Sequence, residues 1–300
     1  MKLENKILKI SMVGALFFAL FGIAWGWTAQ SEMIIFDGLY SFISLALTML
    51  SLYINNFIAK KELDKYPFGK YILEPLVISF KSLIIGGMCL YSLIGAIQDV
   101  VHGGNTVEYG SALIYSIVSV IGCGGVYIFM KKKGDKISSE LIKVEASQWL
   151  MDTLLSIGVL VGFVIAMILR NTRFSGLNVY IDPMMVIMVS VVFIKMPVQS
   201  FINAFKEILC VKANDEINDD IYFIVKEIEK EYKFEDSISR VSKIGGELRI
   251  EIDFIYNEES KLKDLDQMDC VREKVYDAIK HIDYNKWLNV SFTGDKKWAI

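Results

Sequence analysis

The chain has 300 residues, of which 53% are hydrophobic and 22% are charged. Residues 1–207 hold 17 basic and 14 acidic side chains, whereas residues 208–300 hold 15 basic and 21 acidic ones. An acidic tail excludes the basic surface that binds nucleic acid. Two histidines and four cysteines without a CxxC pair exclude a histidine-rich or cysteine-rich zinc site. We therefore expect a membrane domain over 1–207 and a water-soluble domain over 208–300.

Six apolar stretches have the length of roughly 20 residues that a membrane helix needs. In chain order they cover 7–29, 33–58, 72–99, 109–130, 141–169 and 180–201. The first has no small-residue cleavage site after its apolar run, so it predicts a membrane helix and not a removed signal peptide. The sixth opens with Asp182-Pro183, a pair typical of a helix start.

Basic residues in the short connections predict the orientation, because they remain on the cytoplasmic side. They gather at the N-terminus, in the second connection and in the fourth, as Lys2, Lys6, Lys9, Lys60, Lys61, Lys65, Lys70, Lys131, Lys132, Lys133 and Lys136. The fifth connection, with Arg170 and Arg173, is a mild exception. We expect an integral membrane protein of a bacterial-type plasma membrane, with both termini in the cytoplasm.

The acidic tail has the pattern of a small α/β domain. Residues 215–233 have apolar side chains at helical spacing, and 262–281 predict a second helix. Residues 237–244 and 247–256 alternate as strands around Gly245-Gly246, a hairpin signal, and 287–292 form a last strand. The order α-β-β-α-β predicts an open-faced sheet with helices on one side.

Two predicted spans carry polar side chains at the same spacing of i, i+3 and i+7. In the second span they are Asp37, Tyr40 and Ser44, and in the fifth they are Glu145, Gln148 and Asp152. This spacing places each trio on one helix face. Two such faces turned together would form a carboxylate-lined cleft that suits a divalent cation and proton coupling. The alternative is that these polar residues pack helices against each other.

Lys81, inside the third span, is a second unusual residue. It lies seven residues after Glu74 on the same helix face, about 10 Å deeper at 1.5 Å per residue. A lysine at this depth predicts a counter-ion for one of the carboxylates, or a substitute for a bound cation. Alternatively, its side chain extends back to the cytoplasmic surface.

Four motifs, in this order, resemble those of the cation diffusion facilitators. They are Ser31-x5-Asp37-Gly38-x-Tyr40-Ser41, Tyr66-Pro67-Phe68-Gly69-Lys70-x3-Glu74-Pro75-Leu76, Glu145-x2-Gln148-x3-Asp152-x3-Ser156 and Tyr180-x-Asp182-Pro183. The resemblance covers nearly the whole chain. It implies a homodimer joined partly through metallochaperone-like tails, and alternating access that exports a divalent metal ion against protons.

By position, the family's transport site falls on Tyr40, Ser44, Gln148 and Asp152. Most members carry Asp or His at the first three positions, and only Asp152 keeps that chemistry here. Zinc is not favoured, because it prefers imidazole, thiolate or several carboxylates. We expect Asp37 and Glu145, one turn earlier on each helix, to add negative charge for a hard divalent ion, with no resident cofactor.

The sequence therefore predicts a proton-coupled divalent metal cation efflux transporter that contacts lipid, protons and its transported ion. Alternatively, the chain is a transport-inactive scaffold or regulator that dimerises through its tail, or it carries a non-zinc or non-metal cation. We do not expect an enzyme, since the sequence shows no nucleophile–base pair and no cofactor-binding loop.

Overall fold

The computed structural model describes residues 2–58, 60, 64–137, 140–170, 172, 173, 175–262 and 264–299. The membrane part comprises α1 (Lys2–Ala29), α2 (Glu32–Ile58), α3 (Leu73–Val101), α4 (Tyr109–Ile137), α5 (Glu140–Arg170), a 3₁₀ turn (Ser175–Tyr180), α6 (Ile181–Phe193) and α7 (Lys195–Ile208). Together they provide six stretches that are long and apolar enough to cross a membrane, one in each of α1 to α5 and a sixth over Ser175–Ile208. The expected six-helix membrane fold is therefore confirmed.

The sixth predicted span is interrupted. It consists of α6 and α7, which are separated at Ile194. Pro197 explains the interruption, because proline has no N–H to donate to the carbonyl four residues earlier, that of Phe193. Helical hydrogen bonding resumes directly after the interruption, where the Val198 N–H donates to the carbonyl of Ile194 at 3.3 Å.

The chain divides into two compact units. One contains Met1–Leu50 and Lys81–Gln199, and the other contains Ser51–Phe80 and Ser200–Ile300. The sequence predicts a boundary between 207 and 208, whereas the second unit also includes the connection between the second and third spans. We call these the membrane unit and the tail unit, and we describe each separately.

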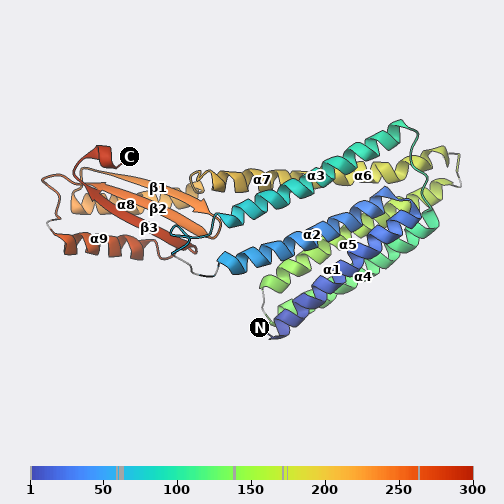
Figure 1. Ribbon diagram of the computed structural model, residues 1–300, viewed down its shortest axis with the longest axis horizontal. Coiled ribbons are helices and arrows are strands. Elements are labelled where there is room, and N and C mark those ends of the chain that lie inside the picture. Colours follow the sequence, from blue (N-terminus) through green and yellow to red (C-terminus); the bar gives the residue numbers. More distant parts are fainter. Residues whose placement is uncertain are drawn as a thin grey trace. The chain divides into compact units, whose positions relative to one another are not determined.

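The core of the membrane unit is a layer of apolar side chains between helices. Phe36 of α2, Ala112 of α4 and Phe163 of α5 are fully or almost fully buried in one cluster. Figure 1 shows α1, α4 and α5 side by side, and the contacts between these three helices agree. Small residues such as Ala112 allow neighbouring helix backbones to approach closely within a membrane.

The tail unit contains a three-stranded sheet with helices packed against it (Figure 1). Its elements are α8 (Asp215–Tyr232), β1 (Asp236–Ile244), β2 (Glu247–Ile255), α9 (Leu265–Ala278) and β3 (Asn285–Thr293). Strand β2 pairs antiparallel with β1 and parallel with β3. The expected α-β-β-α-β order is confirmed, and the core residues include Ile221, Val271 and Ile250 from both helices and the sheet.

Two carboxylates hold the hairpin between β1 and β2. The Gly246 N–H donates to Glu74 Oε2 at 2.8 Å, and the Gly245 N–H donates to Glu207 Oε2 at 2.9 Å. We call Glu74, Glu207, Gly245 and Gly246 the hairpin clamp. Nearby, Arg249 donates to the carbonyl of Phe68 at 3.0 Å. These bonds explain why the Ser51–Phe80 segment belongs to the tail unit.

Candidate functional site

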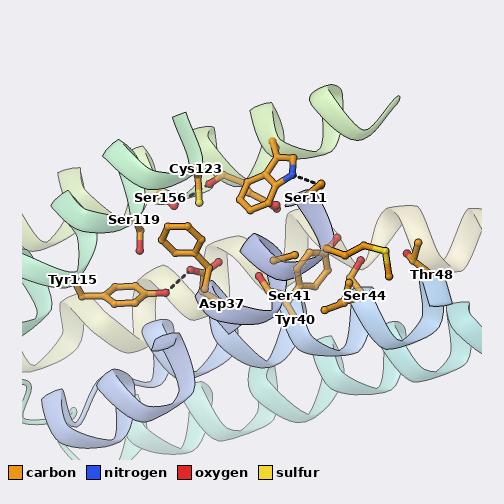
Figure 2. A pocket seen from close by; sticks show the side chains of 16 residues that line it. Ser11, Asp37, Tyr40, Ser41, Ser44, Thr48, Tyr115, Ser119, Cys123 and Ser156 are labelled. Carbon is orange, nitrogen blue, oxygen red and sulfur yellow. Dashed lines mark hydrogen bonds between the residues drawn. The ribbon is translucent and has the colours of Figure 1, made fainter. Parts of the chain in front are cut away.

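A cavity of about 50 Å³ lies between α1, α2, α4 and α5 in the membrane unit (Figure 2). This volume accommodates a few water molecules or a partly hydrated ion, but not a large organic substrate. Its polar lining residues are Ser11, Asp37, Tyr40, Ser41, Ser44, Thr48, Tyr115, Ser119, Cys123, Trp149, Asp152 and Ser156. Most of these side chains are hydroxyls, so the wall is rich in neutral oxygen atoms.

Four of the residues predicted from the sequence meet at this cavity. Asp37, Tyr40 and Ser44 come from α2, and Asp152 comes from α5. The helical spacing explains the convergence, because each group occupies one face of its helix. The side chains of Glu145 and Gln148 lie outside the described residues, so their predicted roles stay predictions.

Lys81 is not among the described residues that line the cavity. It lies in α3 of the membrane unit with its side chain half-buried. Its role as a counter-ion therefore stays a prediction.

Sequence reasoning missed the contribution of α4. Tyr115, Ser119 and Cys123 follow one another at intervals of four residues and line one wall of the cavity (Figure 2). All three are buried, and the Ser119 hydroxyl interacts with that of Tyr115. The i, i+4, i+8 spacing of polar residues in an apolar helix was the signal that could have revealed this wall.

Helix α1 closes the cavity from a further side. Trp149 of α5 donates its indole N–H to Ser11 Oγ of α1 at 2.8 Å. Tyr115 of α4 donates its hydroxyl to Asp37 Oδ2 of α2 at 3.0 Å. These two hydrogen bonds, each between side chains of different helices, fix two walls of the site.

Asp182 is not among the residues that line this cavity; it marks the start of α6 as expected, but its carboxylate does not cap that helix. The structure places it in the first turn of α6, while the N-cap of that helix is Tyr180, which makes no side-chain cap bond. The fully buried Asp182 carboxylate instead accepts hydrogen bonds from Ser31 Oγ at 2.5 Å and the Glu32 N–H at 2.8 Å. It therefore caps the start of α2, whose first N–H groups lack partners within their own helix.

The Tyr66–Leu76 motif has a structural role within the tail unit. The ammonium of Lys70 lies 4.0 Å from the centre of the Phe57 ring and 4.7 Å from that of Tyr66. It also donates to the carbonyls of Phe57 at 3.4 Å and Lys60 at 3.1 Å. A cation there complements the carbonyl groups at the end of α2.

The donor chemistry of the cavity suits a small cation. Among the described residues, Asp37 and Asp152 supply carboxylates, Cys123 supplies a thiol, and the hydroxyls supply neutral oxygens. Within the same part of the chain, no three side chains of Asp, Glu, His or Cys group closely enough to hold a metal ion. A bound ion would therefore depend on hydroxyl oxygens and water as well as on carboxylates.

Comparison with known proteins identifies the family. The family model of the cation efflux transmembrane domain matches residues 8–209, more than half of the chain. The chain belongs to the cation efflux family. This agrees with the resemblance drawn from its four motifs, and with an integral membrane protein of six spans followed by a small α/β domain.

Two curated relatives of this cation efflux chain are similar to it at low identity. The magnetosome protein MamB of Magnetospira sp. (strain QH-2) is 21% identical over 258 residues, 86% of this chain and 85% of the relative. The manganese efflux system protein MneP of Bacillus subtilis (strain 168) is 27% identical over 173 residues. That second match covers 58% of this chain and 55% of MneP.

Proposed function

We propose that this member of the cation efflux family exports a divalent metal cation through the α1–α2–α4–α5 cavity in exchange for protons. The observation that carries the proposal is the meeting of Asp37 and Asp152 on one cavity within the membrane helices. A carboxylate inside a membrane is costly and typically marks an ion or proton pathway.

Charge balance supports an exchange mechanism. Two carboxylates can neutralise one divalent cation, and two protons can replace that cation with the same total charge. In this mechanism Asp152 binds the ion and then a proton, Asp37 supplies the second charge, and Tyr40 and Ser44 supply neutral oxygens. Gln148 and Glu145 are further proposed ligands on α5.

Manganese is our preferred substrate. Oxygen donors from carboxylates and hydroxyls suit Mn²⁺, whereas zinc prefers imidazole or thiolate. The relative MneP is a manganese efflux system protein, which points in the same direction. We further propose a homodimer joined through the tail units, with both termini in the cytoplasm, as the basic connections indicate.

A second candidate is a transport-inactive scaffold. It is favoured by the lack, among described residues, of three close Asp, Glu, His or Cys side chains. The two candidates differ in one property that can be measured, the movement of metal ions across a sealed membrane.

The test is metal uptake by purified protein in proteoliposomes under an imposed pH gradient, with Mn²⁺, Zn²⁺ and Mg²⁺ offered separately. We expect gradient-driven Mn²⁺ flux that falls at least about a hundredfold in Asp152→Asn, because removing a charge-bearing ligand typically costs several kcal/mol. Glu108→Gln is the matched control, since this exposed carboxylate lies outside the cavity. No flux from folded protein would support the scaffold, whereas full activity of Asp152→Asn would show that transport does not depend on this cavity carboxylate.

A further inference from the structure

The hydroxyl of Tyr115 holds one of the two cavity carboxylates from a separate helix. Tyr115 is 2% exposed, and its Oη donates to Asp37 Oδ2 at 3.0 Å (Figure 2). Its ring stacks on that of Phe21 with the ring centres 5.6 Å apart. The aromatic contact fixes the ring, and the ring in turn places the hydroxyl at the carboxylate.

Close packing of α1 on α2 makes this hydrogen bond possible. A Cβ at Gly22 would lie 2.7 Å from Tyr115 Oη and 3.0 Å from the Gly38 Cα. A Cβ at Gly38 would lie 2.6 Å from the Ile23 nitrogen. Glycine at both positions therefore leaves room for the hydroxyl at the point where the helices cross, next to Asp37.

A tyrosine hydroxyl is a suitable partner for a carboxylate that must also meet a cation. It fixes Oδ2 by a directed hydrogen bond and adds no positive charge, whereas lysine or arginine would neutralise the carboxylate. The second oxygen, Oδ1, then stays available to an ion in the cavity.

Ser119 belongs to the same polar wall as Tyr115. It lies one helical turn after Tyr115, is 2% exposed, and lines the same cavity. Its hydroxyl interacts with that of Tyr115 and makes no other hydrogen bond among the described residues. A buried hydroxyl with so few partners is suited to a bound ion or its water.

We propose that Tyr115 is a positioning residue that orients Asp37 toward the transported cation and so sets the affinity of the site. This inference rests on the proposed function, and it adds α4 to the helices that determine cation binding. Tyr115 acts through Asp37 and does not itself have to touch the ion.

The test is a double-mutant cycle on full-length protein in proteoliposomes, with Mn²⁺ as the probe. Tyr115→Phe keeps the stacked ring and removes the hydroxyl, so we expect the KM for Mn²⁺ to rise about tenfold with little change in maximal flux. Asp37→Asn should raise the KM at least as much. The KM of the double variant should be no higher than that of Asp37→Asn alone, because both substitutions remove the same interaction.

Ser116→Ala is the matched control. Ser116 is the next residue on α4, is equally buried, and donates to the carbonyl of Ala112 in its own helix at 2.7 Å. We expect the KM of Ser116→Ala for Mn²⁺ to equal that of the unmodified protein. Equal melting temperatures for all variants would show that the KM change is not a folding effect.

Several outcomes would overturn the inference. An unchanged KM in Tyr115→Phe, or effects of the two changes that multiply in the double variant, would show that Tyr115 does not act through Asp37. The proposed function would stand even then, provided that the wild-type protein transports Mn²⁺ and Asp152→Asn does not. If the wild type shows no flux, a Mn²⁺ binding titration by paramagnetic resonance replaces KM; unchanged affinity or no binding would then overturn the inference.

Discussion

Carboxylates are held in opposite ways in the two units. In the tail unit, outside the hairpin clamp, many pair with basic side chains near water, as Asp236 does with Lys296 at 2.9 Å. In the membrane unit, Asp37 accepts from a tyrosine hydroxyl, and Asp182 accepts from a serine hydroxyl and a backbone N–H. Exposed ion pairs contribute little to stability, whereas buried hydrogen-bonded carboxylates cost much when their partners are lost. Substitutions in the two units should therefore differ widely in effect.

The largest expected effect on stability comes from Asp182 at the start of α2. Asp182→Ala leaves the Ser31 hydroxyl and the Glu32 N–H without their acceptor, while Ser31 Oγ still accepts from the Ile34 N–H at the start of α2. We expect a loss of about 3 kcal/mol, measured as a lower melting temperature in detergent. Asp182→Asn keeps one acceptor oxygen and should lose less. An unchanged melting temperature in Asp182→Ala would contradict the capping role.

An intermediate effect is expected at the hairpin clamp. Gly245 has a positive φ of 56°, and an added Cβ would lie 2.6 Å from Glu74 Oε2 and 2.9 Å from the carbonyl oxygen of Tyr71. Gly245→Ala should therefore cost about 1–2 kcal/mol in the same melting experiment. At Gly246 the nearest atoms would be 3.7 Å away, so Gly246→Ala is the matched control. Equal losses in both variants would show that the close approach of Glu74 is unimportant.

The smallest effect is expected at the surface pair of the tail. Lys296, then the Ser237 N–H and Lys226, lower the pKa of Asp236 to about 2 from its ordinary value of 3.8. Because the pKa is lower in the folded state, this stabilisation is present above pH 4 and is lost as the pH falls toward 2. Asp236→Asn should cost a few tenths of a kcal/mol at neutral pH, since the carboxylate is about one-third exposed. Melting curves at several pH values should show that the stability difference between the wild type and Asp236→Asn narrows between pH 4 and pH 2. A difference that stays constant over this range would refute the contribution of the Asp236 carboxylate.

The sequence predicted the fold well where one physical signal dominates. Apolar length gave the six spans, and alternation with Gly245-Gly246 gave the hairpin of the tail. It did not predict the separation of α6 from α7, because Pro197 lies in a stretch whose apolar composition continues on both sides. A hydropathy pattern measures burial in lipid and carries no information on backbone hydrogen bonds.

The site was predicted in part for a related reason. Charged residues in an apolar helix stand out, so Asp37 and Asp152 were found together with the residues at matching positions. Tyr115, Ser119 and Cys123 did not stand out, since such residues are common where membrane helices pack together. Asp182 was interpreted as the start of its own helix, because a sequence does not show that a carboxylate caps a helix 150 residues away.

The hairpin clamp has a practical consequence for building chimeras from this protein. A tail transferred to another protein from residue 208 onward would lack Glu74, Glu207 and the Phe68 carbonyl. These groups hold its hairpin and Arg249 in place. The transplantable module is thus discontinuous: the tail must travel with the connection between α2 and α3 and with the last turns of α7. Its natural cut points are the unit boundaries near residues 50, 80 and 199.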